Sequence, residues 1–408
     1  MVMAAAIQHG LRLFLLIRFI IGLGVYPIQQ PKSKIRRIVY LSILYSLIIW
    51  FSYGYFFYYV ITFFPLRVLF FTIINIVVHY ITIFITFTSV IINFYYEEKF
   101  QMCMKRLAAV DDTLEKLGSP KIYRRMHMLS KRMIIGWIVY TFVSNFYDTY
   151  WWLKKEKAPW GLILGLILNF CFHINTFEDL LFLFLLWYIG TRFDKVNKNV
   201  RCLLIKENHE LRCTWKKSTV SLHRYVNYKQ TLWTSMHLHL ELCRIARELN
   251  LLFGVQMTVE MASYLFFISA LCYFFYIMIQ EQHNKISLYY RFDNIFWISL
   301  SFIRVAVISF ICENVTVKAN KIGKVIHQLT NSLRYTDVSK EICQFALQTM
   351  QHPLKFNGMN LFCFGNVFLQ KICSRYCDLI LFISHLIWQA NYGINFSTAQ
   401  LKRIFVEN

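Results

Sequence analysis

Two oppositely charged residues stand inside long apolar stretches, where an ionisable side chain is costly. Glu260 lies within residues 250–280 and Arg304 within residues 294–312. At a helical rise of 1.5 Å per residue, each charge lies about 13 to 15 Å from one end of its stretch. Antiparallel helices that cross about 30 Å of hydrocarbon would bring both charges to one level. The sequence therefore predicts an intramembrane ion pair between Glu260 and Arg304, either structural or with a role in a pocket or in gating.

A second group combines a carboxylate with aromatic side chains. The stretch "NFYDTYWW" and two later apolar stretches supply Asp148, Tyr150, Trp151, Trp152, Tyr273, Tyr276 and Trp297. Rings stack on the apolar face of a small ligand and a carboxylate accepts its hydroxyl protons, so this set is a candidate ligand-binding site. Trp and Tyr also gather at membrane interfaces, so a structural aromatic belt is the alternative.

Patterns for catalysis or metal binding are missing from the sequence. His237 and His239 precede Cys243, but residues two apart face opposite sides of a helix, which does not suit zinc. No Gly-rich phosphate loop, nucleophile elbow or plausible carboxylate pair is present. We therefore predict no metal, no cofactor and no enzymatic activity.

The elements that must position these residues are membrane helices. The chain of 408 residues is 57% apolar and only 16% charged, which is typical of integral membrane proteins. A helix needs about 20 apolar residues to cross a bilayer. Candidate spans are 38–66, 68–96, 133–153, 158–191, 250–280, 294–312 and 359–389. The predicted fold class is thus all-α, a seven-transmembrane helical membrane protein.

The distribution of Lys and Arg predicts the orientation. These residues crowd the segments before the first span and between spans 2 and 3, 4 and 5, and 6 and 7, whereas the opposite connections hold few. Cationic loops resist translocation, so the N-terminus is predicted to be cytoplasmic and the C-terminus extracellular. This orientation excludes a G-protein-coupled receptor. The net charge of +22 then favours contact with anionic membrane lipid, and nucleic acid is not a predicted partner.

Several connections carry helical patterns of their own. Apolar residues at helical spacing run from Phe100 to Leu114 and stop before Gly118, a good C-cap. Residues 208–257, 315–329 and 339–351 are similar, and the last presents Ile342, Phe345, Ala346 and Met350 on one face. We therefore expect long cytoplasmic helix extensions. Glu178 and Asp179 are interpreted as the inner boundary of the fourth span.

The last span is predicted to be split. Pro353 cannot continue a helix and Gly358 permits a turn, so a docking helix ends in the cytosol and a separate helix starts at the membrane. The alternative interpretation is that the segment around Pro353 and Gly358 is an ordinary connector. The predicted segments are 1–38 (cytoplasmic, with an amphipathic or half-inserted helix), 39–93 (spans 1 and 2), 94–132 (cytoplasmic helical loop), 133–190 (spans 3 and 4), 191–250 (cytoplasmic helical loop), 251–313 (spans 5 and 6), 314–358 (cytoplasmic helices with the first half of span 7), 359–390 (its membrane half) and 391–408 (extracellular tail).

Cysteine and glycosylation patterns add two smaller expectations. Eleven cysteines scattered through spans and basic loops do not form a disulfide framework, and only Cys373 and Cys377 are a pair worth testing. Asn314 and Asn395 begin glycosylation sequons, but the predicted orientation leaves only Asn395 outside the cell.

The chain resembles the insect gustatory receptors, which share a superfamily with the insect odorant receptors. The resemblance rests on "IRFIIGLGVYP", "FQMCMKRLAAVDDTLEKLG", "ELCRIARELNLLFGVQM" and "ICENVTVKANKIGKVIHQL" followed by "FALQTMQHPLKFNGMNLFCFG", in this order along most of the chain. It implies a homo- or hetero-tetrameric, tastant-gated cation channel of the plasma membrane of gustatory receptor neurons. It also implies that four split seventh helices line the pore.

The C-terminal part departs from the family pattern. The usual Thr-Tyr, five apolar residues and Gln-Phe are missing, and Lys371, Arg375 and Asp378 occupy positions of an apolar helix. Either the membrane helix begins near Leu379, or this end comes from a different exon or an unspliced gene. Under the first hypothesis the pore and gate residues are Leu379, Phe382, Ile383 and Gln389. The tastant class stays open among sugar, bitter compound and amino acid, with an odorant receptor or a secondary transporter as the alternative function.

The orientation gives the first testable prediction. An epitope tag fused to residue 1 should stain only after the plasma membrane of an expressing cell is permeabilised, because the basic segments stay in the cytosol. A tag fused to the C-terminus should stain intact cells. Staining of the N-terminal tag on intact cells would contradict the charge argument and the receptor class that rests on it.

Overall fold

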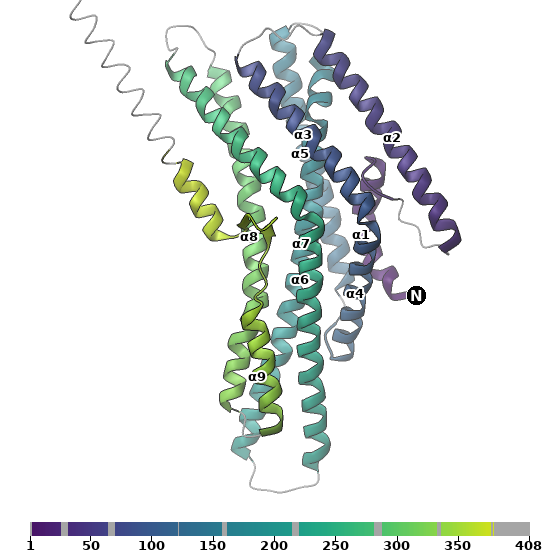
Figure 1. The fold of residues 1–408 in the computed structure, drawn as a ribbon, viewed down its shortest axis with the longest axis vertical. Coiled ribbons are helices and arrows are strands. Elements are labelled where there is room, and N and C mark those ends of the chain that lie inside the picture. Colours follow the sequence, from purple (N-terminus) through teal and green to yellow (C-terminus); the bar gives the residue numbers. More distant parts are fainter. Residues whose placement is uncertain are drawn as a thin grey trace, which may run out of the picture.

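Long helices make up almost the whole of the computed structural model, which describes residues 2–25, 32–63, 70–120, 122–156, 161–213, 220–280, 288–332, 336–376 and 378 (Figure 1). The helices are α1 (Val2–Ile20), α2 (Lys32–Phe63), α3 (Phe70–Tyr95), α4 (Glu97–Lys116), α5 (Tyr123–Glu156), α6 (Gly161–Cys213), α7 (Val220–Gln280), α8 (Leu288–Ser332) and α9 (Thr336–Gln351). A short antiparallel hairpin, β1 (Asn357–Gly358) with β2 (Phe362–Cys363), precedes a further helical segment at residues 366–376.

Five of the described helices are long and apolar enough to cross a membrane. The segments are Arg37–Val60, Val77–Tyr95, Gly165–Cys202, Lys229–Tyr273 and Ile295–Ile326. They lie in α2, α3, α6, α7 and α8 and contain most of the predicted first, second, fourth, fifth and sixth spans. The predicted third span lies within α5, and the predicted seventh span includes residues 366–376.

Helix α6 is the centre of the bundle. It packs against α2, α3, α5, α7 and α8, and its residues 181–186 are buried on every side. A helix that is apolar all round can be stable only where other helices surround it. Glu178 and Asp179 lie just before this stretch and are also buried, so each needs a partner on a neighbouring helix.

Helix α1 is packed into the bundle and does not only lie on a membrane surface. Leu11 and Phe14 are fully buried, and the helix contacts both α4 and α5. The approach is close, because a Cβ atom at Gly10 would lie 2.9 Å from the Sδ atom of Met126. The predicted amphipathic helix therefore uses its apolar face for contacts with protein.

Helix α4 has the buried face that the residue spacing predicts. Its buried residues are Phe100, Cys103, Met104, Leu107, Ala108, Val110, Asp111 and Leu114. Gly118 ends the element with a φ angle of +82°, and the amide of Ser119 donates to the carbonyl of Leu114. Helix α4 lies along α1 and α7 and so continues the bundle beyond α3.

Helix α9 packs beside one end of α8 (Figure 1). Ile342 and Phe345 are buried, and the Phe345 ring meets the His239 ring of α7 edge to face at 5.7 Å. Met350 is 60% exposed, which differs from the predicted apolar face. The reason is that Met350 points about 140° away from Phe345 around the helix axis, at about 100° per residue.

The break after α9 is held in place by side chains from two neighbouring helices. Asn320 of α8 donates to the carbonyl of Leu354 and accepts from its amide, at 3.2 and 3.1 Å. Arg247 of α7 donates to the carbonyl of His352 at 2.7 Å, and Asn250 donates to that of Asn357 at 3.2 Å. These contacts satisfy backbone groups that the interrupted helix leaves without helical partners.

The hairpin that follows shows a different role for Gly358 from the predicted one. The residues with left-handed backbone are Met359 and Asn360, at φ angles of 47° and 61°. Gly358 is needed for space, because a Cβ atom there would lie 2.6 Å from the Phe362 ring and 2.8 Å from Thr258 Oγ1. The split of the seventh helix is thus real, but Gly358 acts by allowing the hairpin to approach α7.

The helix after the hairpin begins before the charged residues. Residues 366–376 are helical, so Lys371 and Arg375 lie within the helix, and the predicted start near Leu379 is wrong. The apolar side chains Phe368, Leu369, Ile372 and Tyr376 hold the helix against the bundle. These contacts come from one face of the helix and leave its other face for the charges.

The contacts of Asn320 can be tested by substitution. Asn320→Ala removes two hydrogen bonds to a residue whose side chain is buried, so we expect a loss of about 1 to 3 kcal/mol of stability. A lower melting temperature of the detergent-solubilised protein would report this loss. Asn314→Ala on the exposed side of the same helix is the matched control and should melt like the unmodified protein. Equal melting of both variants would show that the break does not depend on Asn320.

Candidate functional site

A buried guanidinium joins three helices at the middle of the bundle. Nη2 of Arg304 on α8 lies 2.6 Å from Oδ2 of Asp179 on α6. The Arg304 guanidinium also lies 4.6 Å from the centres of the rings of Phe172 and Tyr264. Cation–π contacts are strongest where water is excluded, and the Arg304 and Asp179 side chains are only 11% and 5% exposed. We call Asp179, Glu260, Tyr264 and Arg304, with Phe172, the buried charge cluster.

Glu260 belongs to this cluster, but not as the predicted ion-pair partner. Its side chain on α7 is 1% exposed and lies within electrostatic range of both Asp179 and Arg304. The predicted Glu260–Arg304 pair is wrong in its partner, because the salt bridge of Arg304 is with Asp179. Residue depth fixes the level of a charge, but rotation about the helix axis decides which neighbour it meets.

A second buried ion pair connects α6 with α1. Nε of Arg18 lies 3.2 Å from Oε1 of Glu178, and their side chains are 5% and 0% exposed. The Arg18 guanidinium also lies 5.6 Å from the centre of the Phe100 ring of α4. Successive residues of a helix point about 100° apart, so Glu178 and Asp179 reach two different helices. Both acids also lie inside the candidate span Gly165–Cys202 and not at its end, which differs from the interpretation of these acids as a span boundary.

A third pair lies further along α6, toward α9. Nε of Arg192 lies 2.7 Å from Oδ1 of Asp111 on α4. The Tyr188 hydroxyl donates to Asp111, and Nη2 of Arg192 donates to that hydroxyl at 2.8 Å. Helix α6 is therefore fastened by ionic contacts to α1, α4 and α8.

The ion pair between α4 and α7 is partly exposed to solvent, unlike the buried pairs of α6. Arg106 lies 2.6 Å from Glu248, and the Cys103 thiol donates to Glu248 at 3.2 Å. Burial, followed by the Glu248 carboxylate, raises the pKa of the Cys103 thiol to about 12. The thiol is therefore protonated at physiological pH and acts as a hydrogen-bond donor.

A polar seam between α5 and α6 leads from the charge cluster toward the end of the bundle opposite α9. The amide of Asn169 donates to Asp148, and the His173 ring lies 3.2 Å from Asn145 and 3.4 Å from Ser144. Tyr140 interacts electrostatically with Asp148, with Asp179 and with Arg304. The seam and the charge cluster are therefore neighbours inside the bundle, with Tyr140 within electrostatic range of both.

The predicted aromatic site is only partly brought together. Asp148 joins the seam, and Trp297 meets the Phe172 ring edge to face at 5.4 Å. Tyr150 and Tyr273 are 53% and 46% exposed and face away from the bundle, as expected of an aromatic belt. The side chains of Trp151, Trp152 and Tyr276 lie outside the described part of the structure. The seam therefore contains Asp148 from the predicted set together with Asn145, Asn169 and His173, and Trp297 of α8 lies beside Phe172 of the charge cluster.

The helix at residues 366–376, which we call the terminal helix, contacts α7 directly beside the charge cluster. The Tyr376 hydroxyl donates to the carbonyl of Leu265 at 2.8 Å, and Leu265 follows Tyr264, whose ring lies on Arg304. At the other end of this helix, a Cβ atom at Gly365 would lie 2.2 Å from Glu313 of α8. The predicted pore residues Leu379, Phe382, Ile383 and Gln389, together with Cys377 and Asn395, lie outside the described residues.

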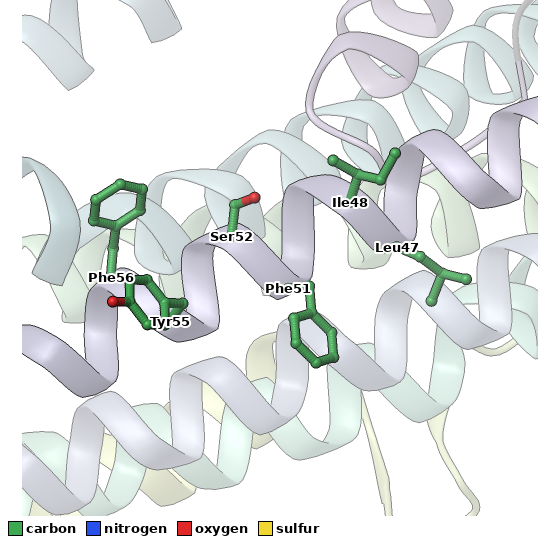
Figure 2. A pocket seen from close by; sticks show the side chains of 6 residues that line it. All are labelled: Leu47, Ile48, Phe51, Ser52, Tyr55 and Phe56. Atoms are coloured by element: carbon green, nitrogen blue, oxygen red, sulfur yellow. The ribbon is translucent and has the colours of Figure 1, made fainter.

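Two surface hollows differ in character from the polar seam. The first is an open apolar groove on a single helix, α2, lined by Leu47, Ile48, Phe51, Ser52, Tyr55 and Phe56 (Figure 2). Its side chains are exposed within a candidate membrane span, so acyl chains of lipid are the matching surroundings. The second lies between α7, α8 and α9, where His239 contacts the carbonyl of Ala319 at 3.0 Å. No group of three potential metal ligands occurs among the described residues.

Comparisons with known proteins agree with this architecture. The chain is similar to the insect olfactory receptor OR5 from Machilis hrabei, with 12% identity, a TM-score of 0.61, and coverage of 93% of this chain and 98% of that one. The structure of the same receptor in complex with eugenol matches with 14% identity, a TM-score of 0.54, and coverage of 93% and 100%. No curated protein matches the sequence.

The family of 7tm chemosensory receptors matches residues 13–374, which is most of the chain. The chain therefore belongs to this family. The matched region includes the buried charge cluster, the polar seam and most of the helix at 366–376. The family assignment and the fold agree with a multi-pass, all-helical membrane receptor of the insect gustatory and odorant superfamily.

Sequence reasoning missed the roles of Arg18, Glu178 and Asp179, although a signal was present. Arg18 interrupts an apolar segment, and the two acids lie inside an apolar stretch of α6. Like Glu260 and Arg304, each of these charges lies inside an apolar segment, where an opposite charge at the same depth on another helix is the expected partner. Asn145, Asn169 and His173 gave a weaker signal, because polar uncharged residues are common in membrane helices.

The Arg304 contacts give a stability prediction. Arg304→Met should cost about 3 to 5 kcal/mol, because it leaves buried carboxyl groups without a cation, and the protein should fail to reach the cell surface. Arg244→Met is the control, since Arg244 is 61% exposed and its pair with Glu248 is worth about 0 to 1 kcal/mol. In the exchange variant Asp179→Arg with Arg304→Asp, surface staining should partly return. Normal surface staining of Arg304→Met would contradict the ionic role.

Proposed function

We propose that this chain is a gustatory receptor, a subunit of a tastant-gated, non-selective cation channel. The proposal places it in the plasma membrane of gustatory receptor neurons, with its N-terminus in the cytoplasm. The family supports a chemosensory role, and the basic segments support the orientation. Under this orientation α9 is cytoplasmic, and the polar seam lies toward the extracellular side.

The observation that carries the proposal is the succession of polar groups from the seam, past the charge cluster, to the terminal helix. Asp148 and Asn169 lie at its outer end, and Arg304 with Tyr264 lies at its inner end. The next residue of α7, Leu265, accepts the hydrogen bond of Tyr376. A ligand that changes the packing of α5, α6 and α8 at the seam would therefore alter the position of the terminal helix.

The seam matches a small ligand that carries hydroxyl or amide groups. Asp148 accepts protons, Asn145 and Asn169 can both accept and donate, and Trp297 provides an aromatic surface. Sugars, amino acids and polar bitter compounds all have these features. The ligand would replace some of the existing hydrogen bonds of the seam. The helices joined by these bonds would then shift relative to one another.

Assembly as a homo- or hetero-tetramer with other gustatory receptors is part of the proposal. The terminal helix touches the bundle on one side only, and four such helices around an axis would enclose an ion path. The side of α9 that carries Met350 and the nearby cytoplasmic helices are available for contacts between subunits. Lipid would then surround the remaining apolar faces, including that of α2 (Figure 2).

An odorant receptor is the second candidate function. The two similar structures are of an olfactory receptor, and one of them contains eugenol, a small molecule. The polarity of the seam favours a water-soluble tastant instead. A parallel screen of volatile and of non-volatile compounds on the same cells would separate the two functions.

Ligand-evoked current in expressing cells tests the proposal. Cells that make this chain, alone or with a second gustatory receptor, should show an inward current when the correct tastant is added. Saturable uptake of a compound with little conductance would contradict the channel and favour a transporter. Silence across broad panels of tastants and odorants, at verified surface expression, would contradict the receptor proposal.

Once an agonist is found, Asp148 can be tested separately. Asp148→Asn should raise the half-maximal agonist concentration by about tenfold, which corresponds to about 1.4 kcal/mol of lost hydrogen bonding to a charged group. Tyr150→Phe, two residues along the same helix and exposed, is the control and should respond like the unmodified protein. Equal effects of the two substitutions would remove Asp148 from the binding site.

A further inference from the structure

The hollow between α7, α8 and α9 is large enough for a small molecule. Its volume is about 400 Å³, within the range of about 300 to 1,000 Å³ that is usual for ligand sites. The three helices lie together at the end of the bundle that carries α9 (Figure 1). The walls include Arg247 and Asn320, whose side chains hold the break after α9. We call this hollow the break cavity, and it lies toward the end of the bundle opposite the polar seam.

The break cavity is rich in hydrogen-bond donors. The Arg247 guanidinium carries five N–H groups, one of which is donated to the carbonyl of His352 at 2.7 Å. The amide of Asn320 carries a second N–H besides the one that it donates to Leu354. Gln348 and Gln351 of α9 add two exposed amides to the wall. The cavity therefore surrounds one guanidinium with neutral N–H donors.

The charge around the break cavity is positive. None of the described residues that line it is acidic. The acids of α7 at this level face α4 instead, where Glu241 and Glu248 lie 3.8 and 2.6 Å from Arg106. Lys321 and Lys355 are exposed and each directly follows a residue of the lining. A concave site with this sign of charge and these donors attracts an anion.

The lining also indicates what kind of anion fits. A guanidinium presents its donors in a fork that matches phosphate. A phosphate ion alone would fill only a small part of the cavity, so the ligand carries a further group. No Phe, Tyr or Trp is among the described lining residues, so a nucleobase finds no ring on which to stack. The amides of Gln348 and Gln351 donate and accept, and the Thr349 hydroxyl, which donates within α9, accepts, so all three suit hydroxyl groups.

We propose that the break cavity binds a phosphorylated polyol, with the phosphate on Arg247 and the hydroxyl groups on Gln348, Thr349 and Gln351. The ligand contacts α7, α8 and α9 together and so stabilises the break from which the terminal helix continues. Only the side of the membrane rests on the proposed function: under that orientation the cavity is cytoplasmic. The ligand is then either a free molecule of the cytosol or the headgroup of an inner-leaflet lipid.

The test is the melting temperature of the detergent-solubilised full chain with inositol 1-phosphate. At about 100 times its dissociation constant this compound should raise the melting temperature by about 3 °C, because it binds only the folded protein. Inositol at matched ionic strength should not. Dioctanoyl phosphatidylinositol carries the same phosphate on a lipid, so a shift with this compound alone assigns the site to a headgroup. A shift with the free compound assigns it to a cytosolic molecule. No shift with either compound overturns the proposal.

Two variants locate the binding in the break cavity. Arg247→Gln removes the charge but keeps a donor for the carbonyl of His352, and it should raise the half-saturating concentration by about tenfold or more. Gln348→Glu adds a carboxylate to the exposed wall and should weaken binding to a similar extent. The matched controls are Arg244→Gln, which faces Glu248, and Asn314→Asp on the exposed side of α8. Both should bind like the unmodified protein. Equal binding by all four variants overturns the proposal.

The melting test needs neither a tastant nor a current, so it separates this site from the channel. The shift should persist in Asp148→Asn, and its loss there would place the compound in the polar seam and overturn the proposal. A shift that Arg247→Gln weakens, in a chain without tastant-evoked current, supports the break cavity while the channel proposal fails. A tastant-evoked current from a chain whose melting temperature neither compound changes leaves the channel in place and overturns the break cavity as a site.

Discussion

The neutralisation of two adjacent carboxyl groups on α6 is the constraint on which the bundle depends. Glu178 and Asp179 lie where neither water nor lipid can stabilise a charge, so each needs a guanidinium from another helix. Because they point in different directions, they connect α6 to α1 and to α8. The Arg192–Asp111 pair extends the same arrangement to α4. The relative rotation of these four helices is thereby fixed.

The same ionic contacts explain how one site could affect another. Arg304 is held by Asp179 and by the rings of Phe172 and Tyr264, so α6, α7 and α8 cannot move independently at this level. The polar seam approaches this level from one end, and the terminal helix contacts it through Tyr376. Such a link would let a change at one set of helices reach another.

The break after α9 shows a further requirement of a membrane helix. Interrupting a helix exposes backbone groups, and these must be satisfied within the protein. Asn320, Arg247 and Asn250 supply hydrogen bonds to the carbonyls of the break, and Gly358 allows the hairpin to lie close to α7. The terminal helix is thus positioned by its anchored start, which leaves one face free to be polar.

The sequence by itself determined the class of fold, most spans, the helical connections and the split of the last helix. These follow from local quantities: the length of apolar runs, the spacing of apolar residues, and the inability of Pro353 to continue a helix. The sequence also indicated that Glu260 and Arg304 share a level, because depth is proportional to residue number. Tertiary structure alone decided that Arg304 pairs with Asp179, that Tyr150 faces outward while Asp148 faces α6, and that Lys371 and Arg375 lie within the terminal helix. Those outcomes depend on the rotation and packing of whole helices, which contacts between distant residues set and which no local pattern contains.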